Sequence, residues 1–196
     1  MLTYDFRLPP GPRTVEYAIL AENLGFRAVW CPEIPAFGHD IWVTLARIAE
    51  RTRRIKFGPS VLIPSYRHPM AQASAIATLE QIAPGRLMVG FGTGFTGRAG
   101  MGKKPLSLAL ASVERADENV RHLSIHRGHS LDISNGHDAL VDISAAKQMT
   151  FTGTREELRE RLAQLETRGA TGIIFGTSGY DVERELRAYA EVAGLR

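Results

Sequence analysis

Apolar and polar positions alternate along the chain between two patterns, one typical of amphipathic helices and one of short buried strands. Residues 14–24 roughly follow helical spacing, and Gly25 stands where a C-terminal cap is expected. The apolar run at residues 27–31 then predicts a buried strand. The same succession of helix, turn and strand recurs and forms a weak internal repeat.

Capping residues help to place the other helices. Asp40 can accept hydrogen bonds at the start of one helix, Pro69 is tolerated in the first turn of the next, and Thr154 with Glu157 forms a capping box. The further predicted helices span residues 41–52, 68–82, 106–123, 154–167 and 182–192. The further predicted strands span residues 2–6, 55–58, 61–63, 86–91 and 171–175.

Alternating helices and buried strands predict an α/β fold with a parallel sheet, either doubly wound or closed into a barrel. A complete eightfold barrel usually needs about 250 residues, whereas this chain has 196. Residues 93–150 hold many glycines and polar residues and contain no convincing buried strand. If the sheet is a barrel, the missing units belong in that stretch.

The composition is that of a globular protein with a core, since 44% of the residues are hydrophobic and 23% are charged. The formal charge is +3 and the basic residues are scattered, so we expect no nucleic-acid partner. The single cysteine, Cys31, excludes an intramolecular disulfide and fits a reducing compartment. Without a signal peptide or an apolar stretch of about 20 residues, we expect a cytoplasmic protein with no membrane partner.

A glycine-rich loop, Gly92-Thr-Gly94-Phe-Thr-Gly97, follows the strand predicted at residues 86–91 and matches G-x-G-x-x-G. Exposed backbone N–H groups in such a loop can bind a phosphate. The dinucleotide alternative, an NAD site, is disfavoured because residues 98–105 make a poor helix and because the loop follows a later strand than the first. A phosphate loop at the carboxyl end of a barrel strand is favoured over a glycine-rich turn without a ligand.

Several histidines and one arginine invite a functional interpretation. His122, His126 and His129 have a spacing that could bind zinc on a helix, but polar histidines in a connector are the favoured interpretation and we expect no metal site. Arg67 and His68 could reach a phosphate, or they could equally cap the next helix.

Three consecutive segments, residues 53–69, 77–80 and 84–94, together resemble the bacterial luciferase-like oxidoreductases. That family includes reduced-flavin monooxygenases and enzymes that use the deazaflavin coenzyme F(420). Residues 150–159 and 169–174 resemble the last helix and strand of the family. The resemblance implies a (β/α) TIM-type barrel abbreviated to about five strand units, with the middle units absent between the two matching parts.

The resemblance also implies a single domain over residues 1–196. Its first units occupy residues 14–105, an irregular connector occupies residues 106–150, and the last unit occupies residues 151–196. An open barrel exposes strand edges and apolar core, which either a partner or residues 93–150 must cover. We expect a homodimer that covers the gap.

By the same resemblance, a flavin or deazaflavin ring lies at the carboxyl ends of the strands, and the cofactor is coenzyme F(420) or FMN. In the deazaflavin-using branch a non-proline cis peptide makes a bulge behind the ring, and Ser60-Val61 occupies the matching place. An ordinary strand after a proline is the alternative. Gly92, Thr93 and Gly94 are expected to face the cofactor.

Glu33 follows the second strand, where the family carries an acid, and is the remaining residue expected at the cofactor. Many relatives place a histidine directly after that acid, for proton transfer or for stabilisation of an intermediate. This chain has Ile34 there, and His39 is the nearest substitute. The sequence therefore assigns no catalytic residue.

The resemblance implies a flavin- or deazaflavin-dependent oxidoreductase that acts on a small-molecule substrate. Hydride transfer is favoured over monooxygenation, because the Ser60-Val61 segment and the glycine-rich loop look most like the deazaflavin branch. A non-catalytic remnant that folds but no longer turns over is the first alternative. An NAD(P)-dependent dehydrogenase, which rests on the glycine motif alone, is the second.

Overall fold

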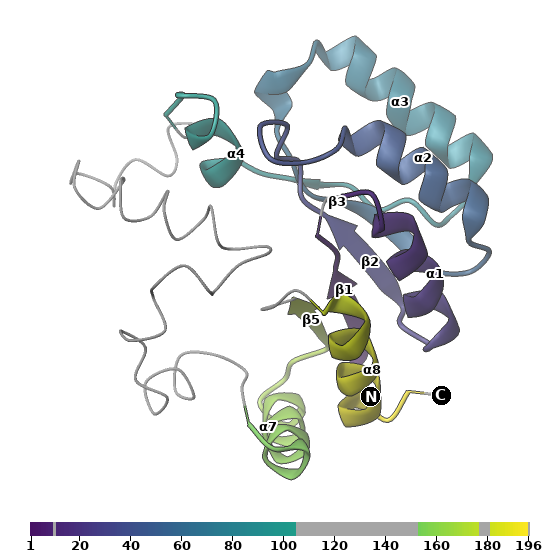
Figure 1. Cartoon of the computed structure of the whole chain (residues 1–196), viewed down its shortest axis with the longest axis vertical. Helices are drawn as coiled ribbons and strands as arrows, with labels where there is room; N and C mark the ends of the chain where they lie inside the picture. Colours follow the sequence, from purple (N-terminus) through teal and green to yellow (C-terminus); the bar gives the residue numbers. More distant parts are fainter. Residues whose placement is uncertain (10, 105–152, 177–180, 196) are drawn as a thin grey trace.

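The computed structural model describes residues 1–9, 11–104, 153–176 and 181–195 (Figure 1). Within them, five strands form one sheet in which every neighbouring pair is parallel, which confirms the predicted α/β fold. The strands are β1 (Thr3–Arg7), β2 (Ala28–Cys31), β3 (Lys56–Leu62), β4 (Gly90–Phe91) and β5 (Gly172–Gly176). The helices are α1 (Thr14–Asn23), α2 (Ile41–Arg51), α3 (Pro69–Ile82), α4 (Phe95–Ala99), α7 (Arg155–Thr167) and α8 (Val182–Ala193).

The strand order β4-β3-β2-β1-β5 places the first and last units of the chain side by side. Tyr4 pairs with Ile173 and Arg7 pairs with Gly176, so β5 lies against β1 as the last strand of a closed barrel would. The helices follow the same order, since α1 packs between α2 and α8, α3 packs against α2, and α7 packs against α8. The described part is therefore a half-barrel with helices on its outer face (Figure 1).

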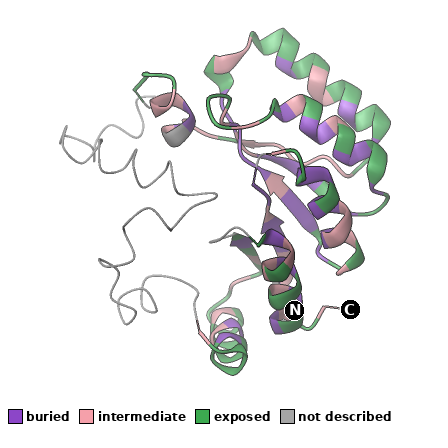
Figure 2. Ribbon diagram, in the orientation of Figure 1, coloured by how far each residue is buried: buried purple, intermediate pink, exposed green. Residues whose placement is uncertain are grey.

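The core lies between the sheet and these outer helices. Phe6 of β1 is fully buried, and its ring contacts the rings of Phe26 and Tyr189. In Figure 2 the buried residues of α1 and α2 accordingly line the side that faces the strands. Because side chains alternate along a strand, Asp5 and Arg7 lie on the opposite face, which we call the inner face.

Capping residues start the helices where the sequence predicts. Asp40 accepts hydrogen bonds from the backbone N–H groups of Trp42 and Val43 at the start of α2. Thr154 and Glu157 form the predicted capping box at the start of α7. Such a cap contributes about 1 kcal/mol. Among the described residues, no helix is long and apolar enough to span a membrane.

The fourth strand is shorter than the strand predicted at residues 86–91. Only Gly90–Phe91 form a strand against β3, whereas Leu87 makes an isolated bridge to Phe57. Pro59 explains the interruption, because it has no N–H group with which to continue the ladder of hydrogen bonds between these points. A proline inside β3 therefore loosens the pairing of its neighbour.

Two further elements differ from the sequence prediction. The strands predicted at residues 55–58 and 61–63 form the single strand β3, and α4 begins inside the glycine-rich loop, where no helix is predicted. The helix predicted at residues 106–123 and the connector predicted at residues 106–150 lie outside the described residues.

Cys31 is expected to resist thiol reagents while the chain is folded. The side chain is almost fully buried, and burial raises the pKa of the thiol to about 12. Because the thiolate is the reactive form, Ellman's reagent at mildly alkaline pH should react at least roughly a thousandfold more slowly than with a free thiol. The same measurement in urea should restore the fast rate, and fast labelling of the folded chain would contradict the burial of Cys31.

Candidate functional site

Three neighbouring strands, β2, β3 and β4, run in parallel, so their carboxyl ends lie at the same end of the sheet. Barrel enzymes build their active sites at this end. The structure places every residue that the resemblance assigns to a cofactor at or shortly after these strand ends: Glu33, Ser60, Val61, Gly92, Thr93 and Gly94. We call these six residues the carboxyl-end site.

Glu33 ties the loop after β2 to the segment after β3. Its buried carboxylate accepts a hydrogen bond from the backbone N–H of Ile63 at 2.6 Å and another from the Arg67 guanidinium at 2.8 Å. Arg67 also pairs with Asp40, the cap of α2. Burial raises the pKa of the Glu33 carboxyl, against the lowering effect of the Ile63 N–H and the Arg67 charge. Both carboxylate oxygens are thus engaged in holding the site together.

The strand β3 carries a bulge at Val61. Ser60 pairs with Gly90 and Leu62 pairs with Phe91, so two steps along β3 match one step along β4. The Ser60–Val61 peptide bond is cis, which confirms the sequence prediction. Ser60 and Val61 are both half-buried, and their contact with a cofactor stays a prediction.

Gly92 and Gly94 lie against side chains of β3 and of the residue after it. A Cβ on Gly92 would stand 2.5 Å from Cγ2 of Val61, and a Cβ on Gly94 would overlap the side chain of Ile63. Gly94 also has φ of +75°, which non-glycine residues rarely adopt. Close packing therefore explains both glycines without a ligand, because the side chains of Val61 and Ile63 fill the space where Cβ atoms would stand.

Tyr66 adds a polar group that the sequence analysis does not single out. Its hydroxyl is buried and has no hydrogen-bond partner among the described residues. A Cβ on Gly97 would stand 2.8 Å from this hydroxyl, so the third glycine of the loop packs directly against it. Burial, and then the charge of Glu33, raise the pKa of Tyr66 and keep the hydroxyl protonated. No spacing in the sequence signals Tyr66, because its position depends on the 3-10 turn Pro64–Tyr66.

The family model of luciferase-like monooxygenases matches residues 7–124. The chain belongs to the luciferase-like monooxygenase family. The match contains all six residues of the carboxyl-end site, and it bears out the resemblance drawn from the sequence.

Two luciferase-like relatives are F(420)-dependent dehydrogenases. A glucose-6-phosphate dehydrogenase from Amycolatopsis mediterranei is 40% identical over 93 residues, which are 43% of this chain and 28% of the relative. A hydroxymycolic acid dehydrogenase from Mycobacterium tuberculosis is 42% identical over 90 residues, which are 42% of this chain and 25% of the relative. The matched part thus spans only about a quarter of each relative.

A similar solved structure supports the fold. A monooxygenase from Streptomyces bottropensis superposes with a TM-score of 0.61 at 18% identity, over 97% of this chain and 98% of that chain. At this identity the likeness concerns the arrangement of the chain alone. It agrees with the parallel half-barrel described above.

None of the histidines that the structure describes in this luciferase-like chain belongs to the carboxyl-end site. His68 caps α3, because its Nδ1 atom accepts a hydrogen bond from the backbone N–H of Met70 at 3.2 Å. His39 is exposed on the loop before α2. In residues 1–9, 11–104, 153–176 and 181–195 no group of three potential metal ligands occurs. The spaced histidines considered for zinc lie outside these ranges: His122, His126 and His129.

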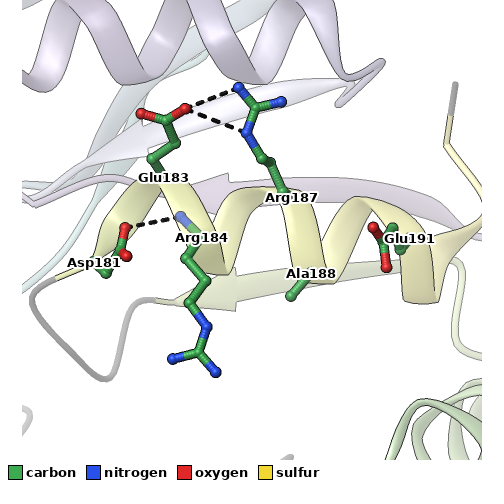
Figure 3. A pocket seen from close by; sticks show the side chains of 6 residues that line it. All are labelled: Asp181, Glu183, Arg184, Arg187, Ala188 and Glu191. Carbon is green, nitrogen blue, oxygen red and sulfur yellow. Dashed lines mark hydrogen bonds and ion pairs between the residues drawn. The ribbon is translucent and has the colours of Figure 1, made fainter.

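A hollow on helix α8 is a different feature of the molecule (Figure 3). Glu183 pairs with Arg187 along the helix, and Asp181 accepts a hydrogen bond from the backbone N–H of Arg184. The remaining lining residues are Ala188 and Glu191. All of these residues come from one helix and its cap, so the hollow needs no functional interpretation.

Proposed function

We propose that the carboxyl-end site binds the ring of coenzyme F(420) or FMN, and that the protein is a flavin- or deazaflavin-dependent oxidoreductase. The observation that carries the proposal is the meeting of the β3 bulge and the glycine-rich loop within residues 7–124, the part that matches the luciferase-like family. The F(420)-dependent relatives support the choice of coenzyme.

Each residue of the site has a task in this proposal. Val61, whose side chain fills the space beside Gly92, offers a surface against which a planar ring can lie. Ser60 and Thr93 carry hydroxyls that can donate hydrogen bonds to the ring. Glu33 acts indirectly by holding the two loops in place. The bound coenzyme would supply the redox chemistry, and the chain would supply orientation and exclusion of water.

Hydride transfer is the finer part of the proposal. The bulge at Val61 and the glycine-rich loop support it, because these two features resemble the deazaflavin branch of the family. Exchange of a hydride between substrate and ring asks the chain to orient the two partners. Where the substrate is an alcohol, its hydroxyl proton must leave as well, and Ile34 cannot accept it, so solvent would be the acceptor.

A non-catalytic remnant is the second candidate function, and the open sheet favours it. Among the described residues, β4 and β5 each pair on one side only. Phe91 and Ile174 on these strands are 60% and 55% exposed. An NAD(P)-dependent dehydrogenase has weaker support, because the glycine-rich loop follows an outer strand of the sheet instead of the first βα turn.

We propose that a second copy of the chain covers this open side. Pairing would cover the exposed strand edges and the apolar side chains of Phe91 and Ile174. Sedimentation at micromolar concentration should give the mass of a dimer. A monomer over the same concentration range would overturn this part of the proposal.

Blocking the site should abolish coenzyme binding without unfolding the chain. Gly58 pairs with Trp30, whose indole reaches Asp5 on the inner face, and alternation along β3 places Ser60 on the same face. Ser60→Trp should therefore fill the space proposed for the ring. Calorimetric titration with coenzyme F(420) and with FMN should show the affinity lowered at least about a hundredfold. Ser74→Trp, on the exposed side of α3, is the matched control and should bind as the native chain does. Equal affinities of the two variants would place the ring elsewhere.

A further inference from the structure

Arg7 is a half-buried arginine that has no partner among the residues that the structure describes. It is the last residue of β1 and lies on the inner face of the sheet, at the carboxyl end. Its side chain makes no hydrogen bond and no ion pair with the residues that the structure describes. A guanidinium carries five N–H donors and loses hydration when it is buried. An unpaired arginine at this place therefore has unused binding capacity.

The surroundings of Arg7 leave room for a ligand. In the register of the sheet Arg7 stands between Gly176 of β5 and Trp30 of β2. Among the residues that the structure describes, a Cβ on Gly176 would meet no atom within 4 Å, so these residues leave the space beside Arg7 open on that side. The bulge of β3 lies two strands away, which is about 10 Å at the usual spacing of strands. A small molecule beside a ring on the bulge would come within reach of Arg7.

No carboxylate of the described chain neutralises Arg7. Asp5, the nearest acid on the same face of β1, already accepts hydrogen bonds from Arg27 and from the indole of Trp30 at 2.8 Å. Burial is the sole cause that lowers the pKa of Arg7, with no contribution from a neighbouring acid.

Arg86 is an arginine with a structural role, and its contacts can be compared with those of Arg7. Burial lowers the pKa of Arg86 as well. Its guanidinium nevertheless donates hydrogen bonds to Thr52, Ala49 and Ile55, and it lies over the ring of Phe57. Arg7 has none of these contacts, so a structural role does not explain its charge.

We propose that Arg7 binds an anionic group, a phosphate or a carboxylate, of a ligand at the carboxyl end of the half-barrel. The planar guanidinium fork matches both groups in a bidentate manner. The inference rests on the proposed function, since it makes the substrate of the oxidoreductase an anion held beside the ring. The same chemistry would also suit a phosphate of the coenzyme itself.

The test measures binding of inorganic phosphate to the whole chain, by calorimetry and by the shift of the thermal midpoint. Arg7→Met keeps the length of the side chain and removes the charge, and it should weaken phosphate binding about tenfold or more. Arg47→Met, on the exposed side of α2, is the matched control and should bind phosphate as the native chain does. Because Arg7 has no partner in the described part of the chain, the midpoint of Arg7→Met without phosphate should equal or exceed the native one.

Three outcomes would overturn the proposal: no phosphate binding by the native chain, equal binding by Arg7→Met, or a midpoint of Arg7→Met lowered by more than about 5 °C. The comparison of FMN with riboflavin identifies the source of the anion. If Arg7→Met erases a preference for FMN, the group is the coenzyme's phosphate, and if the preference is unchanged, the group belongs to the substrate. The phosphate measurement needs no coenzyme. It therefore tests Arg7 even if the ring binds elsewhere, and failure of this inference can be told apart from failure of the proposed function.

Discussion

Replacing Gly58 with alanine should lower the free energy of unfolding by about 3 kcal/mol or more, or prevent folding altogether. A Cβ on Gly58 would overlap the carbonyl oxygen of Met88. The backbone of Met88 is itself held in place, because its N–H donates a hydrogen bond to the carbonyl oxygen of Phe57 at 2.9 Å. Neither side of this clash is a flexible side chain that could move away. Equilibrium unfolding in urea measures the effect.

Gly11→Ala is the matched control for Gly58→Ala. A Cβ on Gly11 would meet no atom within 4 Å, so this variant should stay within about 0.5 kcal/mol of the native chain. If Gly58→Ala were equally mild, the segment before β4 could not lie against β3 as described.

Removing the charge of Arg67 should lower the free energy of unfolding by an amount similar to that expected for Gly58→Ala. Arg67→Met leaves the Glu33 carboxylate buried without its cation, and breaking a buried pair from one side costs about 3–5 kcal/mol. The pKa of Glu33 is already raised by burial, and loss of Arg67 should raise it further. A raised pKa in the folded state means that stability is retained at low pH and lost as the pH rises through that pKa. Urea unfolding should therefore show a deficit that grows from acidic to neutral pH.

Asp40→Asn separates this effect from the second ion pair of Arg67. Asparagine still caps α2, but it removes the charge that Arg67 meets on Asp40. Since Asp40 is exposed, the loss should be about 1 kcal/mol or less and should not share the pH dependence of Arg67→Met. A deficit of Arg67→Met that is small, or that shrinks toward neutral pH, would contradict the role given to Glu33.

The helices could be predicted closely from the sequence because their signals are local. Asp40, His68 and Thr154 each accept a hydrogen bond at the start of the helix that follows, and the choice between phosphate binding and capping at His68 is settled for capping. The fourth strand could not be placed by its own residues. Its length depends on Pro59 in the neighbouring strand, which interrupts the ladder.

The candidate site could be predicted only in part from the sequence, because its contacts join residues that are far apart in the chain. Glu33 and Arg67 stand 34 residues apart, and only the parallel packing of β2 and β3 brings them to 2.8 Å. The glycine motif drew attention to a phosphate, whereas the folded chain shows that Gly92 and Gly94 make room for Val61 and Ile63. Alternation along a strand assigns Arg7 to the inner face, but only the structure shows that none of the described residues pairs with it.

The measurement that tests the central claim most directly is a titration of the purified chain with coenzyme F(420) and with FMN, followed by the absorbance of the ligand and the fluorescence of Trp30 and Trp42. Far-UV circular dichroism first establishes that the chain is folded. We expect saturable one-to-one binding of one of the two coenzymes at micromolar concentration. A folded chain that binds neither at millimolar concentration would contradict the oxidoreductase proposal and leave the non-catalytic remnant in its place.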